Sequence, residues 1–305
     1  MSDLSTPKNT LSILKKHDFG IRKAYGQNFL VDKHILDKIL SAAELKKGER
    51  VLEIGPGIGT MTRHLAERAG SVVTVEIDKR LIPILHETLA AYDNVTIINA
   101  DILKFPLTTL LTPKPEECEA FSRMDQRSMQ GPPESNPPLK VVANLPYYIT
   151  TPIIMALLEG VVRFSSITLM LQKEVAQRML ADPGTKDYGA FSLAVQYRAA
   201  VEIIAAVPPS CFIPKPGVES AIVRLSPHSA PSMDVANEAL FIAIVRAAFG
   251  QRRKTLANAL AAEKSLGLSR EHVVHALRKM RLSETVRGEA LTLAQFAEFA
   301  NAVLH

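Results

Sequence analysis

The sequence predicts an α/β fold, in which helices cover both faces of a mainly parallel sheet, followed by a small all-helical C-terminal domain. Two observations predict it. Short runs rich in β-branched residues alternate with stretches of helical period, which is typical of right-handed strand–helix–strand crossovers. After about Pro231 the strand signal ends and only helical periods remain.

The predicted elements follow one another at fairly regular intervals. The runs read as strands begin at Arg50, Ser71, Asn94, Lys140, Ser166, Val201 and Ala221. Stretches of helical period lie at 30–40, from Thr60 onward, and at 81–89, 172–180, 239–262, 272–280 and 292–304.

These elements divide the chain into a basic N-terminal arm at 1–22, a sheet domain at 23–230 and a helical domain at 231–305. One segment interrupts the sheet domain. Residues 112–138 contain six of the nineteen prolines and little periodicity, which indicates an exposed insertion. We predict no function for it.

Charge and composition limit the class of protein. The 305 residues include 36 Lys and Arg against 31 Asp and Glu, a net charge of +5. The excess lies at the two ends, with five basic residues and one acidic residue at 7–23, and ten against four at 236–288. This distribution favours a polyanionic partner.

Several classes are disfavoured. No apolar run approaches the ~18 residues of a membrane-spanning helix. The two cysteines, Cys118 and Cys211, lie far apart, so neither a disulfide framework nor a zinc site is indicated. The N-terminus lacks a signal pattern, so we expect the cytoplasm.

A glycine-rich turn follows the first predicted strand. Its glycines, Gly55, Gly57 and Gly59, are spaced G-x-G-x-G, unlike the G-x-G-x-x-G of dinucleotide sites. Glu76 ends the next strand, where it can accept both ribose hydroxyls, and Asp101 follows the third, level with an adenine amino group. No phosphate-binding motif accompanies them. An adenosine ligand without pyrophosphate indicates S-adenosylmethionine, although an isolated glycine turn is as often a structural turn without a ligand.

The sequence NLPY, residues 144–147, follows the fourth strand. The Asn144 side-chain oxygen and a backbone carbonyl can accept from an exocyclic amino group and aim its lone pair at a methyl donor. Tyr147, with Tyr148, can stack on a base. Taken alone, such a motif is more often a strand-ending turn; behind the glycine turn and Glu76 it favours methyl transfer to a base.

Together these motifs resemble the rRNA adenine N6,N6-dimethyltransferases of the small ribosomal subunit (KsgA type), from about Lys23 to the C-terminus apart from the insertion. The segments that carry the resemblance are YGQNFL at 25–30, VLEIGPGIGT at 51–60, VEID at 75–78, NAD at 99–101, NLPYYIT at 144–150, LQKEVAQRML at 171–180, CFIPKPGVESAIVRL at 211–225 and AFGQRRKTLANAL at 248–260.

The resemblance implies a Rossmann-like S-adenosylmethionine-dependent methyltransferase domain with a helical RNA-binding domain. It also implies dimethylation of two adjacent adenines in the 3′-terminal hairpin loop of 16S rRNA, within the immature 30S subunit. The cofactor-binding residues it implies are Asn28, Leu30, Gly55, Glu76, Asp101 and Asn144. The catalytic and target-base residues it implies are Asn144, Pro146 and Tyr147, with Phe212 near the base. The long insertion at 112–138 departs from the family and could crowd the approach of RNA.

Basic residues of the helical domain are candidates for RNA contact. A single cluster of basic residues usually marks a solvated helix face. In a chain that also has a base-modifying site, contact with RNA phosphates is the favoured interpretation. The candidates are Arg246, Arg252, Arg253 and Lys254. His272 and His275 have no third ligand nearby, so no metal is expected.

Three other functions remain open. The nearest is a methyltransferase acting on 23S rRNA, which shares most of these motifs. The second is a nucleic-acid-binding factor of this fold that has lost catalysis; the intact Glu76, Asp101 and NLPY argue against it. The third is an NAD-dependent oxidoreductase, which would require the missing dinucleotide motif. We expect a monomer without a membrane or metal partner.

Overall fold

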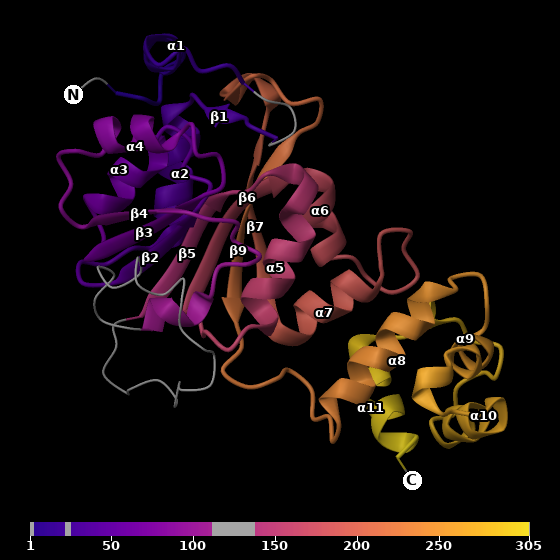
Figure 1. Cartoon of the computed structure of the whole chain (residues 1–305). Coiled ribbons are helices and arrows are strands. Elements are labelled where there is room, and N and C mark those ends of the chain that lie inside the picture. Colours follow the sequence, from indigo (N-terminus) through magenta and orange to yellow (C-terminus); the bar gives the residue numbers. More distant parts are fainter. Residues whose placement is uncertain (1–2, 22–25, 112–137, 305) are drawn as a thin grey trace. The chain divides into compact units, whose positions relative to one another are not determined.

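The computed structural model describes residues 3–21, 26–111 and 138–304 (Figure 1). The chain forms two compact units, one of residues 1–173 with 202–227 and one of residues 174–201 with 228–305. The predicted insertion, except for Pro138, lies outside the described residues. Within the described part of the chain, no helix combines the length and apolarity that crossing a membrane requires.

A seven-stranded sheet forms the centre of the fold, in the order β4-β3-β2-β5-β6-β9-β7. The first five strands in this order are parallel, and β9 runs antiparallel to β6. The mainly parallel sheet predicted from sequence is therefore confirmed. Its strands are β2 (Arg50–Ile54), β3 (Ser71–Glu76), β4 (Val95–Asn99), β5 (Leu139–Asn144), β6 (Ser166–Gln172), β7 (Ala199–Val207) and β9 (Ser220–Pro227).

The order of the strands creates a ligand-binding position. Strand β2 lies between β3 and β5, so the chain builds the sheet outward on one side of β2 and then returns to its other side. In open parallel sheets, ligands bind outside the carboxyl ends of the strands at such a switch point. A separate two-stranded sheet pairs β1 (Phe29–Leu30) with β8 (Phe212–Ile213) in antiparallel orientation, with Leu30 opposite Phe212.

Helices of the first unit pack on the sheet through buried apolar residues. Ile35, Leu36 and Ile39 of one helix join Met61 and Leu65 of the next in a single cluster with sheet residues. Asp32 caps the former helix by accepting from the Ile35 N–H at 3.1 Å. The helices of this unit are α1 (Pro7–Lys16), α2 (Lys33–Ala43), α3 (Thr60–Ala66), α4 (Ile82–Thr88) and α5 (Thr150–Glu159), with 3₁₀ turns at Leu107–Leu111, Tyr147–Ile149 and Pro209–Cys211.

The second unit is helical apart from the first residues of β7. Its helices are α6 (Lys173–Met179), which begins at the boundary, α7 (Ala190–Arg198), α8 (Glu238–Gly250), α9 (Leu256–Ala262), α10 (Arg270–Lys279) and α11 (Leu293–Ala302), with 3₁₀ turns at Lys264–Leu266 and Gly288–Ala290. The stretch of helical period at 239–262 forms two helices, because the chain leaves the first at 251–255 and Thr255 caps a new helix by accepting from the Asn258 N–H.

The two units differ from the sequence-based division at residues 174–201 and, by three residues, at 228–230. Residues 174–201, assigned above to the sheet domain, cluster with the helical unit. The reason is apolar packing, since Tyr188 and Tyr197 are buried in one core with Phe241, and the Tyr197 and Phe241 ring centroids lie 4.9 Å apart. The Tyr188 hydroxyl also donates to the Leu291 carbonyl at 2.7 Å.

We predict that Tyr188→Phe lowers the free energy of unfolding by about 1–2 kcal/mol, because the buried Leu291 carbonyl loses its donor. Urea denaturation followed by circular dichroism measures the change. Tyr92→Phe is the matched control, since its hydroxyl bonds Glu67 at an exposed position. Equal stability of the Tyr188 variant and wild type would contradict this role.

Candidate functional site

A cavity lies at the carboxyl ends of β2, β3, β4 and β5. Its empty space amounts to about 1030 Å³ with the open solvent at its mouth included, and its lining includes these strand ends and residues 26–30. The structure brings together here eight of the residues predicted for the cofactor and the target base, but not Tyr148 or Phe212. The eight are Asn28, Leu30, Gly55, Glu76, Asp101, Asn144, Pro146 and Tyr147.

The glycine turn presents bare backbone to this cavity. Gly55 and Gly57 adopt φ values of +69° and +60°, a region that residues with a Cβ seldom occupy. A Cβ on Gly57 would also approach the Phe29 ring to 3.2 Å. The Gly57 N–H is directed at the Glu76 carboxylate, 3.3 Å from Oε2. The turn therefore lets the chain pass close to the ligand position while it donates to an acidic side chain.

Glu76, the last residue of β3, is held in a defined orientation. Its Oε1 accepts from the Asp78 N–H at 2.8 Å, and its side chain is buried. Burial raises the pKa of Glu76 to about 7, against the effect of these backbone donors. Asp101, after β4, is similarly fixed, because its Oδ1 accepts from the Leu103 N–H at 3.0 Å. Two carboxylates on neighbouring strands thus face one cavity.

Glu53 is a third acidic residue in the cavity, and the sequence reasoning gave it no role. It is fully buried, and neither carboxylate oxygen has a hydrogen-bond partner among the described residues. Burial, together with the charge of Glu76, raises the pKa of Glu53 to about 8 against the opposing effect of the nearby Thr62 hydroxyl, which makes no hydrogen bond of normal geometry with it. The signal was present, since one acidic residue interrupts the apolar run Val51–Ile54. An unpartnered buried carboxylate is a costly feature that a cationic ligand would offset.

Asn144, at the end of β5, is oriented by the N-terminal segment. Its Nδ2 donates to the Asn28 carbonyl at 3.0 Å. A carbonyl oxygen only accepts, so the amide nitrogen must face Asn28, which turns Oδ1 the other way. Asn144 lines the cavity, and its acceptor atom is thereby left for a ligand.

Tyr147 is held by a residue that no sequence pattern marked. Its hydroxyl lies 2.5 Å from the Oγ of Ser220, a fully buried residue at the start of β9. Burial raises the pKa of Tyr147, so the phenol stays protonated at neutral pH. The tyrosine ring is therefore fixed at the cavity wall beside Pro146.

The basic residues predicted to contact RNA belong to the second unit. Arg246, on α8, and Arg253 and Lys254, between α8 and α9, are exposed on the second unit. Arg252 bonds within its own unit, to Glu289 at 2.9 Å and to two backbone carbonyls.

Phe212 is 1% exposed, packs in the apolar cluster under α2, and does not line the cavity. Its burial follows from the pairing of β8 with β1, which uses its backbone to hold Leu30. Among the residues that the structure describes, no group of three or more His, Cys, Asp or Glu is placed to hold a metal ion.

Comparison with known proteins defines the class first. The fold is that of Rossmann-like methyltransferases. A crystal structure of a dimethyladenosine transferase from Plasmodium falciparum matches with a TM-score of 0.69 and 27% identity, covering 89% of this chain and 95% of that one. The 23S rRNA methyltransferase ErmE matches with a TM-score of 0.63 and 27% identity, covering 91% and 100%.

The family follows from the sequence comparison. Residues 18–301 match the model of the ribosomal RNA adenine dimethylase family, and the chain belongs to that family. A ribosomal RNA small subunit methyltransferase A from Lachnoclostridium phytofermentans is 50% identical over 304 residues, which cover 99% of this chain and 98% of that protein.

We predict that Glu53→Gln changes how stability depends on pH. In wild type, the folded protein keeps the Glu53 proton up to about pH 8, whereas the unfolded chain loses it near 4.5. Stability therefore falls between these values, by at most ~1.4 kcal/mol per pH unit from this group. The variant should lose that decline and retain the smaller one due to Glu76.

Thermal denaturation at a series of pH values measures the effect. Glu298→Gln, at an exposed position of α11, is the control and should keep the wild-type dependence. Parallel curves for wild type and Glu53→Gln would show that burial does not raise the pKa of Glu53.

Proposed function

We propose that this chain transfers methyl groups from S-adenosylmethionine to N6 of two adjacent adenines in the 3′-terminal hairpin loop of 16S rRNA during assembly of the small ribosomal subunit. The observation that carries the proposal is the convergence of Glu76, Asp101 and Asn144, from the ends of three strands, on one cavity. Membership of the ribosomal RNA adenine dimethylase family supports it.

The charge of the cavity supports S-adenosylmethionine over a dinucleotide. Its described lining contains three acidic residues, Glu53, Glu76 and Asp101, and neither Lys nor Arg. A pyrophosphate would find no positive charge there, whereas a sulfonium and an ammonium group would be attracted and would favour loss of the Glu53 proton. The orphaned Glu53 carboxylate fits the cationic end of the cofactor, Glu76 the ribose hydroxyls and Asp101 the adenine amino group. Asn28, Leu30 and Gly55 complete the binding surface.

The cofactor, when bound, supplies an electrophilic methyl group, and the residues of the chain position the base. Asn144 Oδ1, turned away from Asn28, accepts one N–H of the adenine amino group, and a backbone carbonyl of the 144–147 turn accepts the other. These bonds favour a pyramidal nitrogen whose lone pair is aimed at the methyl donor. Tyr147, held by Ser220, stacks on the extruded base. Pro146 fixes the turn between Asn144 and Tyr147.

Basic residues of the helical unit contact the RNA backbone in this proposal. Arg246, Arg253 and Lys254 are exposed cations that can neutralise phosphates, which positions the RNA without reading its sequence. Arg252 is a fourth such candidate, since it is also exposed while its guanidinium bonds Glu289 and the Thr185 carbonyl. We also propose a cytoplasmic location and a monomeric working form, since one chain supplies every predicted cofactor and catalytic residue of the cavity.

Mapping of methylated adenines tests the proposed function. Primer extension across both rRNAs, from a strain with and without this protein, should show stops at two adjacent adenines of 16S rRNA only when the protein is present. Loss of a stop in 23S rRNA with 16S rRNA unchanged would favour the alternative that ErmE represents. The 50% identity to a small subunit methyltransferase favours 16S rRNA.

We predict that Glu76→Ala weakens S-adenosylmethionine binding by roughly 10- to 100-fold, because the ribose hydroxyls lose a charged acceptor. Wild-type affinity should also fall as the pH drops below about 7, where Glu76 takes up a proton. Isothermal titration calorimetry measures both effects. Glu67→Ala, an exposed glutamate on the same unit, is the control. An unchanged dissociation constant would remove Glu76 from the ribose site.

We predict that Asn144→Ala keeps cofactor affinity within a few-fold of wild type and slows methyl transfer by roughly 100- to 1,000-fold. The reason is that the amino group loses the acceptor that shapes its nitrogen, whereas the cofactor keeps Glu76 and Asp101. Single-turnover transfer of labelled methyl to immature 30S particles measures the rate. Transfer at the wild-type rate would refute the role of NLPY.

A further inference from the structure

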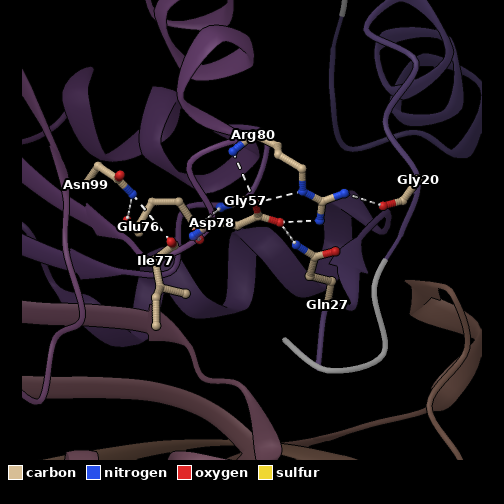
Figure 2. A network of polar contacts seen from close by, with 8 residues as sticks. All are labelled: Gly20, Gln27, Gly57, Glu76, Ile77, Asp78, Arg80 and Asn99. Atoms are coloured by element: carbon tan, nitrogen blue, oxygen red, sulfur yellow. Dashed lines mark hydrogen bonds and ion pairs between the residues drawn. The ribbon is translucent and has the colours of Figure 1, made fainter.

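A network of polar contacts joins the cavity to the N-terminal segment (Figure 2). Its centre is Asp78, which is 2% exposed and lies two residues beyond Glu76. The Asp78 N–H donates to Glu76 Oε1 at 2.8 Å, while its carboxylate accepts from Gln27 Nε2 at 2.8 Å and from Arg80 Nε at 2.9 Å. Asp78 thus contacts both Glu76, at the end of β3, and Gln27, in the segment that leads into β1.

Arg80 fixes the chain on the other side of the same segment. Its guanidinium donates to the Gly20 carbonyl at 2.9 Å and lies 4.6 Å from the centroid of the Phe19 ring. Phe19 in turn meets Phe29 edge to face, with centroids 6.2 Å apart. The Asp78–Arg80 pair therefore holds residues on both sides of positions 22–25 against the end of β3.

The contact between Asp78 and Gln27 is linked to Asn144 through one residue, Asn28. Gln27 precedes Asn28, whose carbonyl accepts from Asn144 Nδ2 at 3.0 Å. The Asn28 side chain donates to the Gly26 carbonyl at 3.1 Å, which stiffens this short stretch. A shift of Gln27 would move the Asn28 carbonyl and release the amide of Asn144.

The charges of Asp78 and Arg80 stabilise the link between β3 and the N-terminal segment. Although burial opposes it, hydrogen bonds from Arg80 and Gln27 hold the pKa of Asp78 below its usual range. The ionised carboxylate is compensated by Arg80, so the network adds little net charge beside Glu76. Removal of one partner would leave a partly buried charge without its counterpart.

We propose that Asp78 is a positioning residue for methyl transfer: through Gln27 it holds residues 26–28 against the cavity, so that the Asn28 carbonyl keeps the Asn144 amide oriented toward the target base. This inference rests on the proposed function. It assigns a positioning role to a pair, Asp78 and Gln27, for which no function was predicted from sequence.

Gln27→Met and Asp78→Asn test the inference. Gln27→Met removes the donor and keeps the length of the side chain, so it carries the test if Asp78→Asn fails to fold. We expect single-turnover methyl transfer at saturating cofactor and 30S particles to slow by roughly 10- to 100-fold. The S-adenosylmethionine dissociation constant should change by less than the transfer rate does, because the Asp78 N–H still orients Glu76 even where Asn28, one part of the cofactor-binding surface, shifts. The double variant should be no slower than the slower single variant.

Glu87→Gln is the matched control. It weakens another attachment of the N-terminal segment, the bonds that the Glu87 carboxylate forms with Lys16 at 2.6 Å and His17 at 2.9 Å, and Glu87 does not line the cavity. It should transfer methyl at the wild-type rate. If wild type transfers no methyl, the proposed function fails.

If wild type transfers methyl and the Gln27 and Asp78 variants match it, the positioning role fails. It also fails if those variants lose only thermal stability or only cofactor affinity, or if their effects on the rate multiply.

Discussion

The burial of carboxylates at the ends of two neighbouring parallel strands is the constraint on which the site depends. Glu53 on β2 and Glu76 at the end of β3 are both removed from water, and burial raises both pKa values, to about 8 and about 7. An apolar residue at position 53 would be more stable in the free protein. The presence of a buried, unpartnered acid at position 53 is therefore best explained by a bound cationic ligand that pairs with it.

The strand order places these buried acids beside the other residues of the site. Because β2 lies between β3 and β5, the ends of separate strands meet at one switch point. Gly57 supplies a backbone donor to Glu76, and Asn28 supplies a backbone acceptor to Asn144. The acidic wall and the amide that faces the base are consequently coupled by backbone groups of the turn and of the N-terminal segment.

Much of this site could be predicted from sequence, and for a physical reason. Glu76, Asp101 and Asn144 each follow a short apolar run, and parallel strands place all such ends at one edge. Ser220 could not be predicted, because a serine that begins a strand carries no signal for a tyrosine 73 positions away. The bond from Gln27 to Asp78 likewise depends on the path of the chain between positions 51 residues apart.

The misplaced boundaries have a similar cause. Residues 174–201 look like any apolar helices in sequence, and only packing of Tyr188 and Tyr197 assigns them to the helical unit. The break at 251–255 leaves the helical period almost intact, so the cap at Thr255 was needed to locate it.

A crystal structure of this protein with S-adenosylmethionine would test the central claim most directly. We expect both ribose hydroxyls to donate to Glu76, the cationic methionine end to lie within reach of Glu53, and the sulfonium methyl to face the space between Asn144 and Tyr147. A cofactor bound elsewhere, or in this cavity with Glu53 and Glu76 still without contact to it, would contradict the claim.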